Sequence, residues 1–135
     1  MKTKNLLTFL VVIFLGSTIM SFMVYQDQKQ GGPWNIPTEY KNKKMPAGTE
    51  ANQGKMLWAV NCKSCHGNTG LGDGPKAAAL KTFPGNFKSA EFQAQSDGTI
   101  YYQSIFGRDE MPNFEKKIPD DEDRWNLVAY IRTLK

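Results

Sequence analysis

The side chains of this chain that are best suited to chemistry lie together in the stretch CKSCHG, residues 62–67. Cys62, Cys65 and His66 are the whole cysteine and histidine content of the 135 residues. Two cysteines separated by two residues can form a redox-active disulfide, supply half of a zinc site, or carry a covalently attached haem. The remaining sequence decides among these three chemistries.

The composition and context of the cysteine pair exclude two of them. A structural zinc site needs four nitrogen or sulfur ligands, and this chain offers three. A redox pair usually lies in an alternating strand–helix context, and no such alternation surrounds this stretch. The pattern C-x-x-C-H instead lets both thiols bond to haem while the adjacent imidazole binds the iron. We therefore predict one haem c, with thioethers to Cys62 and Cys65 and with His66 as the proximal iron ligand.

The second iron ligand must be something other than histidine, because His66 has no counterpart in the chain. Methionine, lysine, tyrosine, an exogenous molecule and an open position are the alternatives. Met45 lies in a polar segment, and Met56 belongs to the attachment helix, where we expect it to pack in the core. Met111 lies in the loop GRDEMPNF and is followed by Pro112, which fixes the path of the chain. A loop can carry a thioether to the far face of the haem and so raise the reduction potential, and Met111 is the expected distal ligand.

The elements that must position these ligands follow helical patterns. Apolar residues at helical spacing predict helices over residues 50–67, 77–81, 96–107 and 120–135, with no competing strand pattern. The last of them begins with acidic and ends with basic residues, which is the order that the helix dipole favours. We therefore predict an all-α domain over residues 50–135. A domain of this size is marginally stable alone, and a covalently bound haem would supply the additional apolar surface that its core needs.

The N-terminal segment, residues 1–26, has the pattern of an export signal or membrane anchor. Lys2 and Lys4 precede an uncharged run, and residues 6–25 are about as long as a bilayer core requires. Both a cleaved signal peptide and an anchor fit this pattern, and the lack of an A-x-A cleavage pattern favours the anchor. We expect the rest of the chain on the periplasmic side of a bacterial inner membrane.

Residues 27–49 separate this leader from the domain. They hold three prolines and three glycines without a helical or strand period, which predicts an extended linker or arm. Trp34, Ile36 and Tyr40 leave open whether the segment is solvated or lies along the domain.

The charge of the chain excludes one class of partner. The 17 Lys and Arg residues face 13 Asp and Glu residues, a formal net charge of +4. Without Lys2 and Lys4 of the leader, 15 basic residues face the same 13 acidic ones. The remaining lysines are scattered rather than gathered in a stripe, and export is the wrong compartment, so we expect no nucleic-acid partner.

Four motifs together resemble a class I c-type cytochrome over residues 50–135: GKMLWAVNCKSCHG, GDGP, MPNF and WNLVAYIRTL. The resemblance implies the fold of that class, with helices wrapped around one haem. It also implies that Gly54 and Trp58 of the first helix cross Leu127 and Tyr130 of the last. A hydrogen bond near a haem propionate is an alternative role for Trp58.

The resemblance further implies that the carbonyl of Pro75 faces the proximal imidazole and orients it. The expected haem wall comprises Trp58, Tyr101, Phe106 and Phe114. The expected function is electron transfer in a respiratory chain between a redox-protein donor and acceptor, by Fe(II)/Fe(III) cycling and without a small-molecule substrate or enzymatic activity. A membrane-anchored haem subunit of a larger respiratory complex is the second form of this function. A gas sensor or peroxidase-like enzyme with an open sixth position is the alternative class.

Overall fold

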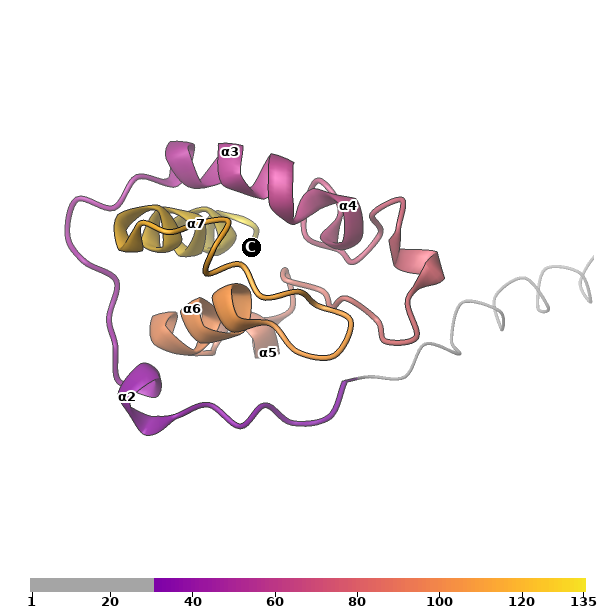
Figure 1. The fold of residues 1–135 in the computed structure, drawn as a ribbon, viewed down its shortest axis with the longest axis horizontal. Helices are drawn as coiled ribbons and strands as arrows, with labels where there is room; N and C mark the ends of the chain where they lie inside the picture. The colour runs from indigo at the N-terminus through magenta and orange to yellow at the C-terminus, as the bar shows by residue number, and fades with distance from the viewer. Residues whose placement is uncertain (1–30) are drawn as a thin grey trace, which may run out of the picture.

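The computed structural model describes residues 31–135, so the predicted signal or anchor segment lies outside the described residues. The elements, in chain order, are α2 (Thr38–Lys41), α3 (Ala51–Asn61), α4 (Lys63–His66), the 3₁₀ turn η1 (Ala77–Ala79), α5 (Ala90–Gln93), α6 (Asp97–Phe106) and α7 (Asp121–Thr133). Helices α3 and α6 flank α7 (Figure 1). Residues 31–135 contain no strand, although isolated bridges such as that between Arg108 and Met111 occur, and the prediction of an all-α fold is confirmed.

The crossing of α3 and α7 depends on Gly54. A Cβ atom at this position would overlap the main chain of Asn126 and lie 2.9 Å from the backbone nitrogen of Leu127. The missing side chain therefore lets the two helix backbones meet. One turn further along, the rings of Trp58 and Tyr130 pack with their centroids 5.8 Å apart. These contacts confirm the predicted crossing of the first and last helices of the domain.

Helices α6 and α7 supply more of the buried apolar side chains than any other elements. The most deeply buried of these are Ile100, Ile105, Leu127, Val128 and Ile131. The side chain of Ser96 caps α6 by accepting a hydrogen bond from the backbone N–H of Thr99 at 3.2 Å. Arg132, near the end of α7, pairs with Asp97 in the first turn of α6 at 2.7 Å. The two helices are thus held together by both apolar packing and an ion pair.

The helix predicted over residues 50–67 is divided at Cys62 into α3 and α4. Cys62 adopts φ −115° and ψ −39°, away from ideal helical values. Its N–H still donates to the carbonyl of Trp58 at 2.9 Å, and its own carbonyl accepts from His66 N–H at 3.0 Å. The chain therefore bends at the first cysteine without losing its hydrogen bonds.

The arm over residues 31–45 lies along the domain, and it includes the short helix α2. Ile36 is 5 % exposed. The ring of Tyr40 contacts those of Tyr102 at 4.9 Å and Phe106 at 5.3 Å, both on α6. In Figure 1 the indigo arm follows the side of α6 that faces away from α7. Of the two arrangements left open by the sequence, the structure shows the packed one.

Tyr101 joins α6 to the start of α7 through its hydroxyl group. This side chain, 2 % exposed, donates a hydrogen bond to the carboxylate of Asp121 at 2.5 Å. A guanidinium nitrogen of Arg124 donates to the same hydroxyl at 3.4 Å. Burial, followed by the hydrogen bond to Asp121, raises the pKa of Tyr101 to about 12. The phenol therefore stays neutral in the folded protein well above pH 10.

We expect Tyr101→Phe to lower the free energy of unfolding of the holoprotein by about 1–2 kcal/mol at neutral pH, because a hydrogen bond to a charged partner is lost. A tyrosine in the unfolded chain ionises near pH 10 whereas folded Tyr101 does not, so its contribution is complete below pH 10 and is lost as the pH rises to about 12. Denaturant unfolding of both proteins across this range checks the prediction. A stability difference that stayed constant from neutral to alkaline pH would contradict it.

Candidate haem site

The attachment cysteines lie at the bend between α3 and α4. The backbone N–H groups of Cys65 and His66 both donate to the carbonyl of Cys62, at 3.2 and 3.0 Å. Both cysteines are free thiols, Cys62 buried and Cys65 half-buried. Burial raises the pKa of the Cys62 thiol to about 12, so it remains a protonated thiol at neutral pH. Two reduced thiols within one helical turn are what covalent attachment to haem requires.

The imidazole of His66 is buried and uncharged. It is 9 % exposed and lies against the rings of Phe87, at 4.7 Å, and Trp58, at 5.8 Å. Burial lowers its pKa to about 4, and an opposing smaller contribution from the Pro84 backbone raises it. Its Nδ1 atom is buried without a hydrogen-bond partner of normal geometry. A neutral imidazole is the form that binds iron, so the donor set Cys62, Cys65 and His66 fits haem c.

The backbone of Pro84, rather than that of Pro75, acts on the pKa of His66, and the role expected of Pro75 stays a prediction. The cause is the path of the chain after α4. The N–H of Lys76 donates to the carbonyl of Ser64 at 2.8 Å, so the GDGP stretch folds back against α4. Pro75 is exposed there, whereas Pro84 in the next loop is partly buried.

The indole N–H of Trp58 has a hydrogen-bond partner within the protein. Its Nε1–H donates to the carbonyl of Gly67 at 3.1 Å. Because an indole has a single donor, this bond leaves none for a haem propionate. Trp58 therefore supports the helix crossing and the His66 ring, and this bond favours that role over the alternative one near a propionate.

Met111 lies in the loop between α6 and α7, as predicted. Its N–H donates to the carbonyl of Arg108 at 2.8 Å, which closes a tight turn with Asp109 at φ 50°. Phe114 N–H donates to the carbonyl of Ile105 at 2.7 Å and returns the loop to the end of α6. The Met111 side chain is half-buried and packs against the core. Its bond to iron remains a prediction.

The other two methionines of the described chain differ in exposure. Met56 is 61 % exposed on α3, so the expectation that it packs in the core is wrong. Met45 is partly buried and packs against the core from the arm. Neither position changes the choice of Met111.

The remaining haem-wall candidates surround α6 and the loop that follows it. Tyr101 and Phe106 lie against Tyr40 of the arm, with ring centroids 6.0 and 5.3 Å away. Phe114 is buried, and the ammonium of Lys117 lies 5.5 Å from its ring centroid. Their contact with haem stays a prediction.

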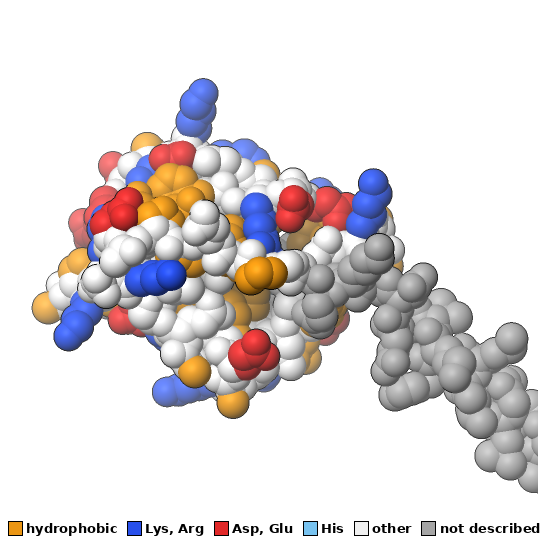
Figure 2. All heavy atoms as spheres, turned by 90° about the horizontal axis from the view of Figure 1, so that it is seen from below, with side chains coloured by type: hydrophobic (Ala, Val, Ile, Leu, Met, Phe, Trp, Pro, Cys, Tyr) orange, Lys and Arg blue, Asp and Glu red, His pale blue; other side chains and the backbone are white. Residues whose placement is uncertain are grey.

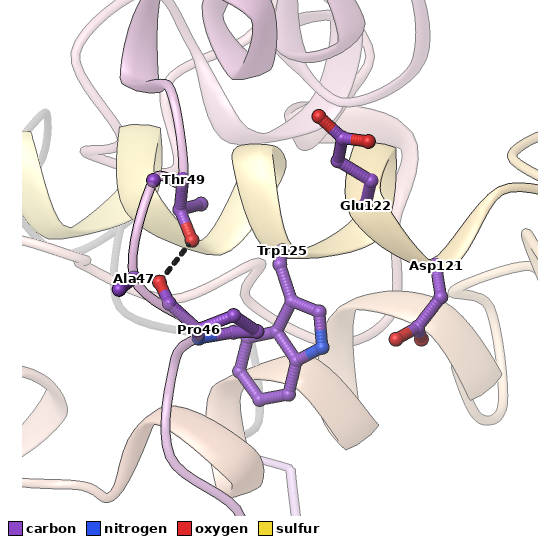
Figure 3. Close-up of a pocket in the computed structure, with 7 residues that line it drawn as sticks. Pro46, Ala47, Thr49, Asp121, Glu122 and Trp125 are labelled. Atoms are coloured by element: carbon purple, nitrogen blue, oxygen red, sulfur yellow. Dashed lines mark hydrogen bonds between the residues drawn. The ribbon is translucent and has the colours of Figure 1, made fainter.

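The hollows on the protein surface are separate from this site. Figure 3 shows one of about 410 Å³, where side chains at the start of α7 face the end of the arm. Its lining consists of Pro46, Ala47, Gly48, Thr49, Asp121, Glu122 and Trp125. No residue of the attachment segment takes part. Within residues 31–135 no cluster of three or more His, Cys, Asp or Glu side chains is arranged to hold a metal ion.

Two crossing terminal helices and a C-x-x-C-H segment at the end of the first define a c-type cytochrome domain. Residues 49–131 match the model of the family described as "Cytochrome C oxidase, cbb3-type, subunit III", and the chain belongs to this family. No curated protein matches the chain. The family assignment supports binding of haem c, electron transfer and redox partners. Among residues 31–135, no helix has the length and apolar character needed to span a membrane.

Proposed function

We propose that this domain is a single-haem electron carrier of a respiratory chain, with haem c bonded covalently to Cys62 and Cys65. His66 and Met111 are the axial ligands. The observation that carries the proposal is the buried, uncharged imidazole of His66, whose Nδ1 atom has no hydrogen-bond partner, directly after two free thiols. The family assignment supports the same cofactor.

The residues around His66 hold its ring ready for the iron. Trp58 and Phe87 restrict the imidazole from its sides, and Trp58 is itself fixed by its bond to Gly67. The carbonyl of Pro84 faces the ring and can accept the proton of its second nitrogen, which would fix the tautomer. Bound haem supplies the Fe(II)/Fe(III) couple, whose potential depends on its axial ligands and burial.

The role of a carrier rather than an enzyme follows from the proposed ligands. With His66 and Met111 on the iron, no coordination position remains for a substrate. Tyr101, Phe106 and Phe114 are the proposed wall that keeps water from the haem. Figure 2 shows basic and acidic side chains interspersed on the face of the domain that it presents, which suits a protein partner of mixed charge better than a nucleic acid.

Membership in a larger complex is the second form of this function. The description of the family names a subunit of an oxidase, and residues 6–25 have the length of a membrane span. An anchored module on the periplasmic side of the membrane would pass electrons to such a complex. Extraction of the native protein with and without detergent distinguishes the anchored form from a free shuttle.

The wild-type holoprotein tests the proposal directly. We expect an intact mass of the chain plus one haem that resists acid extraction, and a reversible one-electron couple. We also expect no carbon monoxide binding by the reduced protein without denaturant, because Met111 occupies the sixth position. Ready carbon monoxide binding would contradict the carrier and favour a gas sensor or a peroxidase-like enzyme.

A further inference from the structure

The turn that carries Met111 is fastened to the N-terminal arm by Arg108. One guanidinium nitrogen of Arg108 donates to the carbonyl of Pro33 at 2.9 Å, and another donates to the carbonyl of Gly32. The guanidinium carbon also lies 4.1 Å from the centre of the Trp34 ring. This arginine thus makes two hydrogen bonds and a cation–π contact with three consecutive arm residues.

The same turn is held from a second direction by Glu110. One of its carboxylate oxygens accepts hydrogen bonds from the backbone N–H groups of Lys81, at 2.8 Å, and Thr82, at 3.0 Å. Arg108 therefore ties the Met111 turn to the arm, and Glu110 ties it to residues 81–82. A turn fixed on both sides opens less often than one held by its own backbone bond alone.

The arm is a firm support because it is anchored independently of Arg108. Ile36 is buried, and Tyr40 packs against Phe106 on α6. The N–H of Gly98 donates to the carbonyl of Lys43 at 3.2 Å. A Cβ atom at Gly98 would overlap the carbonyl of Tyr40, so the arm and α6 meet backbone to backbone. Through Arg108 and the arm, the Met111 turn is therefore linked to α6.

We propose that residues 31–36 form a strap that, through Arg108, holds the Met111 turn closed and so positions the thioether on the iron. The inference rests on the proposed function, because it assumes that Met111 is the distal ligand. The strap precedes residues 49–131, which match the family. Arg108 is thus a positioning residue that keeps the methionine bound and the reduction potential high.

Loss of the strap should appear as easier replacement of Met111 by a competing ligand. The apparent affinity of such a ligand rises with the fraction of molecules whose turn is open. Hydrogen bonds to a charged group are stronger than those between neutral groups, and the partial exposure of Arg108 reduces their contribution. We therefore expect Arg108→Ala to strengthen the binding of imidazole to the ferric holoprotein by about tenfold or more, and to lower the midpoint potential.

Arg132→Ala is the matched control. Arg132 also makes several hydrogen bonds, to Asp97 and to the backbone of Gln93 and Gln95, but none of these bonds reaches the strap over residues 31–36 or the Met111 turn. Its loss should lower the melting temperature and leave imidazole affinity and potential unchanged. Equal shifts in imidazole affinity in the Arg108 and Arg132 variants would show a general loosening of the fold and would overturn the strap.

Two further variants keep the test decisive. Arg108→Lys retains the charge but cannot reach both carbonyls in the manner of a guanidinium, so its imidazole affinity should fall between wild type and Arg108→Ala. Trp34→Ala removes the arm's side of the contact and should shift affinity and potential in the same direction, even if Arg108→Ala fails to take up haem.

The strap and the proposed function fail in different ways. If the ferric wild-type protein lacks the absorption band near the red end of the visible that methionine ligation produces, the proposed ligation is wrong. If the band is present and imidazole binds the Arg108→Ala or Trp34→Ala variant as weakly as wild type, the ligation stands and the strap is wrong.

Discussion

Replacing Gly54 with alanine is expected to lower the free energy of unfolding of the holoprotein by about 1–3 kcal/mol, because overpacking of a tight contact costs amounts of this size. The added methyl group would overlap the carbonyl and carbonyl carbon of Asn126, and it would lie 2.9 Å from the nitrogen of Leu127. These are backbone atoms of α7, which cannot rotate away as a flexible side chain can. The two helices must therefore separate, and the packing of Trp58 on Tyr130 one turn away is disturbed as well.

The sign of this effect makes the prediction sharp. At an ordinary helical position, glycine to alanine stabilises by about 1 kcal/mol through helix propensity alone. Ala59→Gly, at an exposed position of the same helix, is the matched control and should cost about that amount. Denaturant unfolding followed by circular dichroism measures both. A Gly54→Ala protein that is more stable than wild type would show that the close approach of α3 and α7 carries no energetic weight.

The helix crossing was predicted through the resemblance to class I c-type cytochromes, and the residues that carry this part of the resemblance are close together in sequence on each helix. A glycine four residues before a tryptophan on one helix, and a leucine three residues before a tyrosine on another, form a recognisable pattern. The hydrogen bond that Asn126 of α7 accepts from the N–H of Glu50, at 2.7 Å, was not predicted. Nothing in the residues near Asn126 indicates that its partner lies at the start of α3.

The choice between Pro75 and Pro84 could not be made from spacing. Both prolines follow the attachment site, and both stand beside a glycine in a glycine-rich loop. Which of them reaches His66 depends on how the chain folds back. Gly70 and Gly72 adopt positive φ values of 73° and 74°, conformations that determine the path and that glycine alone adopts readily.

The packing of the arm was also beyond sequence reasoning. Trp34 and Tyr40 indicated that the segment could lie on the domain, but its partner Arg108 is far away in the chain. The helix α2 is four residues long, too short to give a periodic pattern. The composition of the segment therefore predicted an extended linker or arm and left its packing open, and its contacts place residues 31–45 against the domain.

Replacing Met111 with alanine is expected to change the redox properties more than any other single substitution outside the attachment segment. A thioether ligand favours reduced iron, so its loss should lower the midpoint potential. The fall should be a sizeable part of the roughly 0.8 V range that axial ligands span. The vacated position should admit carbon monoxide in the reduced protein and imidazole in the ferric protein, and the methionine-dependent absorption band should disappear.

Met56→Ala is the matched control, because this methionine is largely exposed on α3 and belongs to the same helix system as the attachment site. It should keep the potential, the absorption band and the resistance to carbon monoxide of the wild-type protein. Redox titration with optical detection measures the potential and the band, and addition of carbon monoxide to the reduced protein tests the third property. If Met111→Ala instead retains the wild-type spectrum and midpoint potential, the sixth position is filled by another group or is open. The half-burial of Met111 against the core would then reflect packing alone, since a side chain that ligates iron cannot be removed without a change at the metal.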